Sequence, residues 1–340
     1  MRISIVTTIY KAEKDLPRLL DSMMALRNPD LEFYLIDNGS PDRCGEICAE
    51  YARKDSRFFV LTLKENIGYI RARMLGLKEC HGDYVGFCDS DDYLEPNGYD
   101  HAAQVISEQN CDLYITAHMV HMGGGELLMK PPYKTGLYQD ESINQTILPQ
   151  AFGFLKNRDR LHGYMWKQVV RKDLVLNAGI SLIENLKPWE DQIFNIDVIK
   201  RCQRVYIDDH VIYHYFANTG SVTASMIKNF DAHDFWQKTR SLYQEKIKRA
   251  SKPIERRATA NSALFNIDLL VVSLCRKHIT ASHEVKNTLS ALFSGDEVWH
   301  QICSESNNED LSKRLLIVKY CLKAKLYRPL FYIVKHKLRG

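Results

Sequence analysis

The 340-residue sequence has no apolar run long enough to span a bilayer. Its best stretch, residues 269–274, is far shorter than the roughly 20 residues that a transmembrane helix needs. The first residues also lack the apolar core and the small-residue cleavage site of a signal peptide. We therefore expect a cytoplasmic protein, and these absences leave peripheral attachment to the inner face of the cell membrane open.

Signatures of several common protein classes are missing as well. No G-x-G-x-x-G follows the first expected strand and no G-x-x-x-x-G-K-[ST] is present, which argues against a dinucleotide fold and a P-loop. The nine cysteines are scattered, and only Cys44 and Cys48 lie close together, so we interpret them as buried thiols of a reducing compartment. The formal net charge of +4 is too small to indicate a general nucleic-acid binder.

What the sequence does contain is an ordinary globular composition, with 45% hydrophobic and 26% charged residues. The length favours about two domains. We expect a catalytic domain at residues 1–225 and a helical domain at residues 226–340.

Strand and helix signals alternate in the first third of the chain. Short β-rich runs predict strands at residues 2–8, 32–36, 58–63 and 83–88, and helical spacing predicts helices at residues 14–26, 42–52 and 67–80, with Asp42 as the cap of the second. This alternation predicts an α/β fold with a mostly parallel sheet flanked by helices. Ligands bind beyond the carboxyl ends of such strands, so the segments that follow the strands should share one edge.

The rest of the chain is less regular until a helical region begins near residue 231. We expect a strand at residues 112–122 that returns as a hairpin at residues 133–138, after a turn at residues 123–125. A helix at residues 189–199 and two short strands, at residues 205–207 and 211–215, should follow.

An acidic cluster, Asp-Ser-Asp-Asp at residues 89–92, directly follows the fourth expected strand. Three carboxylates within four residues repel one another, and a hard divalent cation such as Mg²⁺ or Mn²⁺ would remove that cost. The alternative is a polar turn whose aspartates cap the next helix.

Several ordered motifs together resemble the inverting family-2 glycosyltransferases, which have a nucleotide-sugar-binding GT-A fold. The resemblance runs from residue 3 to about residue 96 and returns at residues 189–194 and 213–223. Its motifs are Thr-Ile-Tyr-Lys at 8–11, Asp-Asn-Gly-Ser at 37–40, Asn-Ile-Gly at 66–68 followed by Ala-Arg-Met-Leu-Gly at 72–76, and the acidic cluster. Lys11, Asn38 and Met74 depart from the usual pattern, which leaves the identity of the donor sugar open.

The resemblance implies a donor site and a metal site. The implied contacts to the nucleotide sugar, most plausibly UDP-linked, are Thr8, Tyr10, Asp37, Asn66, Arg73, Asp89 and Ser90. By the same resemblance, Asp91 would ligate Mn²⁺ or Mg²⁺, and His214 would complete the metal's ligands. A histidine at this position is also compatible with an ordinary packing role.

The resemblance further implies that Asp191 is the general base that deprotonates the acceptor hydroxyl, with Glu190 as its helper. Carboxylates at a helix N-terminus are also favoured by the helix dipole, which is the structural alternative. Trp166, Lys167 and Trp189 are the implied acceptor-binding residues, although packing explains Trp166 and Lys167 equally well.

The final segment, residues 313–340, is basic and contains no acidic residue. Apolar residues interleave with the cations, which suits an anionic membrane surface or, alternatively, a solvated face on a packed helix. The expected function is therefore a metal-dependent inverting glycosyltransferase with a glycan or lipid-linked acceptor, in the synthesis of bacterial lipopolysaccharide, O-antigen or capsule. The helical domain would serve acceptor binding, membrane binding or self-association into a homo-oligomer.

Two other functions are alternatives to this hypothesis. The first is a non-catalytic nucleotide- or glycan-binding protein on the same fold. The second is a sugar-nucleotide pyrophosphorylase, but residues 8–15 do not offer the Gly-rich basic loop that such an enzyme needs to bind a triphosphate.

Overall fold

The computed structural model describes residues 1–154, 163–177, 179–180, 183–187, 189–217 and 229–339, and the chain divides into two compact units. The first, here called the sheet unit, comprises Met1–Gln145, Gly163–Glu184 and Asp197–Asn218. The second, the helical unit, comprises Thr146–His162, Asn185–Ile196 and Thr219–Gly340. Segments from the middle of the chain therefore contribute to both units.

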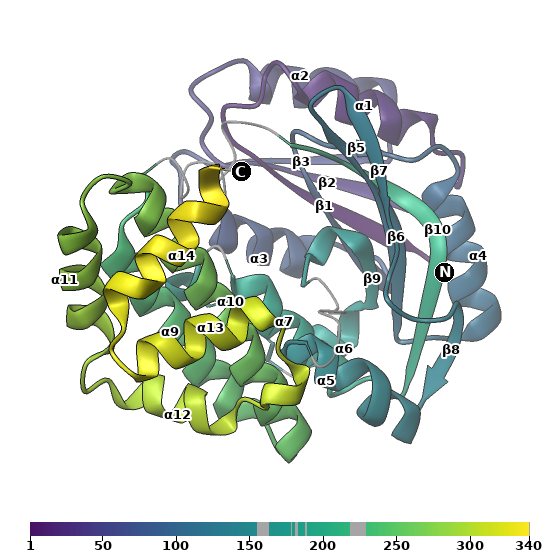
Figure 1. Ribbon diagram of the computed structural model, residues 1–340. Coiled ribbons are helices and arrows are strands. Elements are labelled where there is room, and N and C mark those ends of the chain that lie inside the picture. Colours follow the sequence, from purple (N-terminus) through teal and green to yellow (C-terminus); the bar gives the residue numbers. More distant parts are fainter. Residues whose placement is uncertain (155–162, 178, 181–182, 188, 218–228, 340) are drawn as a thin grey trace. The chain divides into compact units, whose positions relative to one another are not determined.

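The sheet unit is built on one ten-stranded sheet in the order β3-β2-β1-β4-β9-β6-β10-β5, with β7 beside β6 and β8 beside β10 (Figure 1). Its strands are β1 (Ile3–Ile9), β2 (Leu31–Asp37), β3 (Phe58–Thr62), β4 (Tyr84–Asp89), β5 (Tyr93–Leu94), β6 (Leu113–Met122), β7 (Gly125–Met129), β8 (Gly136–Gln139), β9 (Gln168–Arg171) and β10 (Arg204–Phe216). The pairings among β1, β2, β3 and β4 are all parallel, which confirms the expected α/β class.

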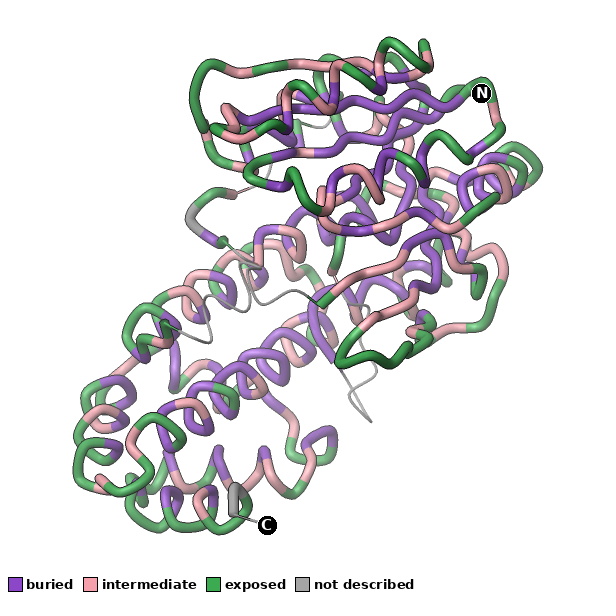
Figure 2. Tube along the Cα trace, turned by 90° about the horizontal axis from the view of Figure 1, so that it is seen from above, coloured by how far each residue is buried: buried purple, intermediate pink, exposed green. Residues whose placement is uncertain are grey.

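Helices cover the parallel strands on both sides. They are α1 (Leu16–Ala25), α2 (Cys44–Lys54), α3 (Tyr69–Glu79), α4 (Gly98–Gln109) and α6 (Lys172–Asn177). All seven residues of β2 are buried, as expected when neither face of a strand reaches water (Figure 2). α3 approaches β1 closely at Gly76, where a Cβ would lie 2.4 Å from a methyl group of Val6.

Three local predictions needed correction. The strand that returns from β6 is β7, which follows Gly123 and Gly124 at once, and the segment expected to form this hairpin instead contributes β8, which pairs with β10. The two short strands expected at 205–215 are one strand, β10, with shifts in its pairing register. The N-cap of α2 is Arg43 and not Asp42, which lies one residue further from the helix; from there its carboxylate accepts from the backbone N–H groups of Cys44, the first residue of α2, and of Glu13.

The helical unit confirms the expected helical region. Its helices are α5 (Leu148–Phe152), the start of α7 (Glu190–Ile199), α9 (Ala232–Arg249), α10 (Pro253–Lys277), α11 (Ser282–Phe293), α12 (Glu297–Glu305), α13 (Lys313–Lys323) and α14 (Tyr327–Arg339). α10 packs against α5, α9, α11, α12, α13 and α14. By length and composition α10 alone among the described helices is apolar enough to cross a membrane, but 78% of its most apolar window is buried, as in the core helix of a bundle.

Short helical turns complete the described chain, with a π-helix at Ile143–Ile147 and 3₁₀ turns at Met165–Lys167, Glu184–Leu186 and Asn308–Asp310. All nine cysteines are unpaired, six of them buried and three half-buried, in agreement with their interpretation as thiols.

Candidate active site

The carboxyl ends of β1, β2 and β4 lie side by side in the sheet unit. Thr8 on β1 is in register with Asp89 on β4, and Ile9 is in register with Asp37 on β2. Adjacent strands are about 4.8 Å apart, so these ends form one edge. The structure thus brings together the segments that the sequence analysis placed at a common ligand-binding edge.

Asp37 ends β2 and is 3% exposed. Its Oδ1 accepts a hydrogen bond from the backbone N–H of Ser40 at 3.0 Å. A Cβ at Gly45, in the first turn of α2, would lie 2.9 Å from Oδ2, so any larger residue there would press on the carboxylate. Glycine at 45 therefore leaves this side of Asp37 uncovered.

The turn after Asp37 is tied to the loop after β3. Asn38 donates from its side chain to Asn66 Oδ1 at 3.3 Å and accepts from the backbone N–H of Ile67 at 3.0 Å. Gly39 has a φ of +67°, and a Cβ there would lie 2.5 Å from the backbone carbon of Glu65. Asn38, one of the three departures from the usual pattern, thus holds two loops of the site together, and Asn66 takes part through its side chain.

Arg73 reaches the same edge from α3. The guanidinium is 6% exposed and pairs with Asp89 Oδ1 at 2.9 Å. It also lies over the rings of Tyr69 and Phe87, at 5.6 and 5.8 Å from their centroids. A cation held this rigidly at the end of β4 suits contact with an anion, the role that the sequence predicted.

Asp92 has a structural role that the sequence analysis missed. Its carboxylate is fully buried and accepts from the hydroxyl of Tyr213 at 2.5 Å and from the backbone N–H of Phe216 at 2.8 Å. The same hydroxyl accepts from the backbone N–H of Asp89 at 3.1 Å. Burial raises the pKa of Asp92 well above its usual value, and Asp89 and Asp91 raise it further. Asp92 therefore braces the acidic turn from within, whereas Asp89 and Asp91 are only half-buried.

Arg18 is a second residue that the sequence analysis missed. A guanidinium N–H donates to the backbone carbonyl of Asp91, and the group lies 4.0 Å from the ring centroid of Phe216. Arg18 also pairs with Asp15 at 3.5 Å. No sequence signal pointed to it, because an arginine on the outer part of an amphipathic helix is typical of any solvated face.

His214 has both ring nitrogens engaged in this structure. Nδ1 lies 2.8 Å from Nε2 of His121, and Nε2 contacts Glu95. Within the described ranges, no group of three His, Cys, Asp or Glu side chains is arranged to hold a metal ion. Asp89 and Asp91 still fit Mg²⁺ or Mn²⁺, because such ions are often held by one or two carboxylates together with the phosphates of the substrate. His214 does not join them in this arrangement.

Trp166 lies inside an aromatic stack and is 5% exposed. Its ring stacks on Tyr213 at 4.4 Å and on Tyr164 at 4.9 Å. Lys167 is also buried, and its backbone carbonyl accepts from the hydroxyl of Thr116. Packing, the alternative weighed for this pair, therefore describes both residues, and the exposed ring of the stack is that of Tyr164.

The predicted base belongs to the helical unit. Glu190 and Asp191 form the first turn of α7, where Glu190 is buried and Asp191 is half-buried. Trp189 is half-buried, with its ring edge-on to Phe235 at 5.2 Å. The buried Lys246 of α9 donates to the side chain of Gln192 at 2.8 Å, beside Asp191 in sequence. The late part of the resemblance, residues 218–223, lies outside the described residues.

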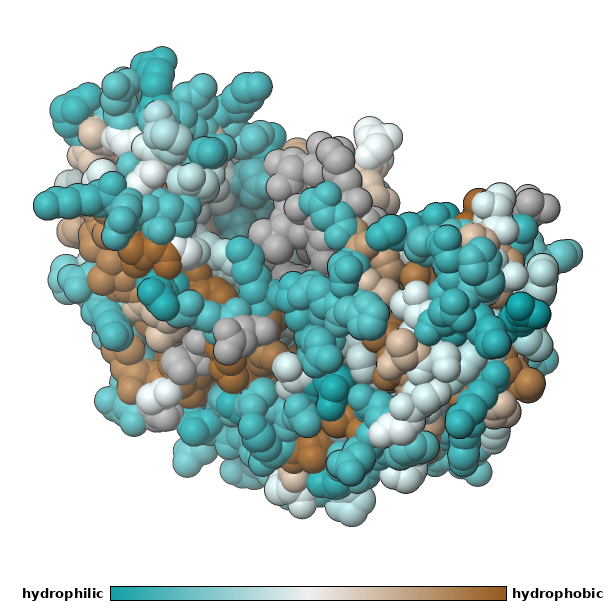
Figure 3. Space-filling model, turned by 90° about the vertical axis from the view of Figure 1, so that its left-hand side faces the viewer, coloured by the Kyte–Doolittle hydropathy of each residue, from teal (hydrophilic) through white to brown (hydrophobic). Residues whose placement is uncertain are grey.

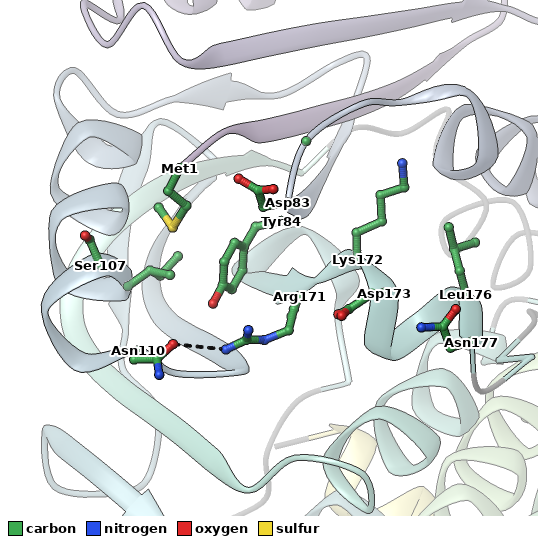
Figure 4. Close-up of a pocket in the computed structure, with 12 residues that line it drawn as sticks. Met1, Asp83, Tyr84, Ser107, Asn110, Arg171, Lys172, Asp173, Leu176 and Asn177 are labelled. Atoms are coloured by element: carbon green, nitrogen blue, oxygen red, sulfur yellow. Dashed lines mark hydrogen bonds between the residues drawn. The ribbon is translucent and has the colours of Figure 1, made fainter.

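A cavity of about 600 Å³ lies at the opposite, amino end of the parallel strands (Figure 4). It is lined by Tyr84 at the start of β4, by Arg171 at the end of β9 and by Lys172 at the start of α6. Arg171 donates to Asn110 there and pairs with Asp112. The cavity contains none of the predicted site residues, and its position is the wrong end of the sheet for the ligand of an open α/β fold.

The sheet is mixed, parallel among β1–β4 and antiparallel in most of its other pairings, so the expectation of a mostly parallel sheet holds only for its first part. With its flanking helices and the acidic residues beyond β4, it defines the class as a GT-A fold. Residues 4–165, just under half of the chain, match the profile of "Glycosyl transferase family 2". In a crystal structure, Staphylococcus aureus TarS 1–349 in complex with UDP-GlcNAc has a similar fold, with a TM-score of 0.69 and 20% identity over 100% of this chain and 92% of that one.

Two curated proteins are similar in sequence. One is the "Uncharacterized glycosyltransferase EpsJ" of Bacillus subtilis, 28% identical over 65% of this chain and 62% of that protein. The other is the "Poly(ribitol-phosphate) beta-N-acetylglucosaminyltransferase TarS" of Staphylococcus aureus, 27% identical over 63% of this chain and 35% of that protein. The matches thus span less than two thirds of these relatives.

Proposed function

We propose that this protein is an inverting glycosyltransferase that moves a sugar from a UDP-sugar to a hydroxyl of a glycan or lipid-linked acceptor, with Mn²⁺ or Mg²⁺ as its cofactor. The observation that carries the proposal is the shared edge of Asp37 and the half-buried Asp89 and Asp91, inside the part of the chain that matches the family. The UDP-GlcNAc complex of the similarly folded TarS supports a UDP-linked donor.

The predicted donor-binding residues would each contact a different part of the nucleotide sugar. Thr8, Tyr10 and Asp37 would hold base and ribose, since a carboxylate accepts from a uracil N–H or a ribose hydroxyl. Tyr10 is 42% exposed and so has a ring face to offer. Arg73 would contact the diphosphate or the sugar, beside Asp89 and Ser90.

Asp91, with Asp89, would ligate the metal through carboxylate oxygens. A bound divalent cation would offset the negative charge that builds on the departing diphosphate. The contribution of this chain is positional, because Arg18 and Asp92 hold the acidic turn from two sides.

Asp191 would take the proton from the acceptor hydroxyl, which attacks the anomeric carbon on the face opposite the leaving diphosphate. The sugar–phosphate bond breaks as the new glycosidic bond forms, and the configuration inverts in one displacement. Asp191 is favoured over Glu190 for this role because Glu190 is 2% exposed and Asp191 is half-buried. A base must reach the proton that it removes.

A role in bacterial surface polysaccharide synthesis is supported by the poly(ribitol-phosphate) acceptor in the name of TarS. Lipopolysaccharide, O-antigen and capsule chains all carry suitable hydroxyls. The proposed acceptor class therefore depends on similarity to TarS alone. The proposed donor class depends on that similarity and on the residues at the sheet edge.

The test is release of UDP from UDP-GlcNAc, UDP-glucose and UDP-galactose by the purified chain, with and without Mn²⁺, followed by NMR. We expect slow, metal-dependent release from one donor, which an added acceptor accelerates to give a product of inverted configuration. Tight UDP binding without release from any donor would instead support a non-catalytic binding protein on the same fold.

A further inference from the structure

The last two helices, α13 and α14, expose a different set of side chains from the one their sequence suggests. Most apolar residues of this segment lie in the core of the helical unit, namely Leu315, Val318, Leu322, Leu330, Phe331 and Val334. The apolar side expected to face a membrane is therefore used for packing, and any lipid contact has to come from other residues.

Among the described side chains of this segment, four large apolar or aromatic ones are exposed. Tyr332 is 59% exposed, Tyr320 51%, Leu326 49% and Ile333 37%. On the face drawn in Figure 3, hydrophobic side chains gather in patches within a mostly hydrophilic surface. Tyrosines together with aliphatic side chains are typical of protein surfaces that lie in the interface of a bilayer.

Exposed cations occur in the same segment. Lys323, Lys325, Arg328 and Lys337 are all exposed, and none of them has an ion pair among the described residues. Lys319 differs, because it is buried and donates to Ser306 and Asn308. The segment contains no acidic residue between 313 and 340, so its own side chains do not neutralise these cations.

A small apolar groove includes the exposed Ile333 and Lys337 in its lining. It has a volume of about 180 Å³ and an apolar lining from α10, α13 and α14, namely Val272, Ile317, Val318, Leu330, Ile333 and Val334. Arg276, Arg314 and Lys337 complete the lining, and Arg314 pairs with Asp268 at 2.9 Å. The groove is smaller than a typical site for a whole small molecule, so it suits only part of a ligand.

We propose that this surface, called here the α13–α14 surface, docks on an anionic lipid bilayer. The cations would contact headgroup phosphates, Tyr320 and Tyr332 would lie at the headgroup level, and the groove would accept part of one acyl chain. The positive charge alone would also fit a nucleic acid. The apolar groove and the exposed aliphatic side chains, however, have no counterpart on a nucleic acid backbone and fit a lipid. This docking does not depend on the proposed transfer reaction.

The test is sedimentation of the full chain with vesicles of phosphatidylcholine alone and of phosphatidylcholine with phosphatidylglycerol. We expect binding only to the anionic vesicles, weakened by salt because the attraction is screened. Replacing Lys323, Lys325 and Arg328 by glutamine should lower the vesicle partition coefficient about tenfold or more, since each cation near an anionic surface adds to binding. Adding Tyr332→Ser to this triple variant should lower the partition coefficient further. It should also reduce the vesicle binding that persists at high salt.

The matched control replaces Arg53, Lys54 and Lys78, three exposed cations of the sheet unit, by glutamine. It makes the same change in net charge and should leave vesicle binding unaltered. Thermal unfolding and UDP release, measured on all variants, should be unchanged. Equal losses in both triple variants, equal binding to neutral vesicles, or a gel shift with DNA in place of vesicle binding would overturn the proposal.

Discussion

The sheet unit and the helical unit bury polar groups in different ways. In the sheet unit, Asp37, Arg73 and Asp92 are buried where strands or the loops after them meet one edge. In the helical unit, buried polar groups are spread over several helices: Glu255 accepts from the backbone N–H groups just before α10, and Asn261 donates to the backbone carbonyl of Phe154 and to Asp310. Polar burial at one edge marks a binding site, whereas dispersed polar burial marks packing.

This difference separates two kinds of mutational effect. Changes at the edge of the sheet should alter ligand binding more than stability. Changes in the core of the helical unit should alter stability and leave nucleotide binding alone. The predicted base, Asp191, is an exception to this division. It belongs to the helical unit, but its substitution should alter the reaction and not the stability.

The largest effect is expected from Asp191→Asn. The substitution keeps the shape of the side chain and removes its basicity, so kcat should fall by about 10²- to 10⁴-fold. Calorimetry should show unchanged affinity for UDP, because the donor residues belong to the sheet unit. Asp234→Asn, an exposed acid on α9, is the control and should leave both quantities alone. A variant with normal turnover would remove Asp191 from the mechanism.

Leu264→Ala should give the next largest effect. Leu264 on α10 is fully buried, and such a truncation costs about 2–5 kcal/mol of unfolding free energy. Hydrogen exchange should show the loss in the helical unit, with UDP affinity unchanged. The matched change Leu35→Ala, at a fully buried position of β2, should reduce protection in the sheet unit and lower UDP affinity as well. If both variants weakened UDP binding equally, the two units would not be independent in this respect.

Asp91→Asn should act on binding and depend on metal. Loss of an outer-shell partner of a metal site commonly costs 10- to 100-fold in affinity, so loss of a ligand should weaken UDP binding in Mn²⁺ by roughly tenfold or more. In the presence of a chelator, the variant and the wild type should bind UDP equally. Titration calorimetry in both conditions is the measurement, and equal affinities in Mn²⁺ would reject the metal role.

The smallest effect is expected from Tyr213→Phe, which removes the hydroxyl that joins Asp92 to the backbone of Asp89. An unsatisfied buried group costs about 1–3 kcal/mol, so the sheet unit should lose stability in that range. Tyr243→Phe is the matched control in the helical unit, because Tyr243 is also buried and its hydroxyl has no hydrogen-bond partner within the described chain. Denaturant titration should find that change neutral or slightly stabilising.

Much of the sheet unit could be predicted from the sequence. The sequence locates β1, β2, β3, β4 and the helices between them to within a few residues. The spacing of hydrophobic residues and the turn residues, on which these predictions depend, are local signals. The strand pairing beyond β5 was not predicted, since β8 and β10 pair across a long stretch of chain. A register between distant segments leaves little trace in either segment alone.

The candidate site was predicted in part for the same reason. Asp37, Arg73 and Asp89 stood in recognisable motifs and lie at one edge, but Arg18 and Tyr213 belong to segments far from the acidic cluster. The resemblance implied that Trp166 binds the acceptor sugar. In the structure its ring is instead stacked between Tyr164 and Tyr213. An isolated tryptophan does not reveal whether its faces will be covered.

The sequence by itself determined the α/β class, the order of strands and helices in the first third and the presence of acidic residues beyond β4. These features depend on residue spacing and turn chemistry within short windows. Only the tertiary structure decided which of three neighbouring aspartates is buried, and which apolar residues of α13 and α14 are core and which face solvent. Burial is set by the partners that pack against a residue, and here those partners come from distant parts of the chain.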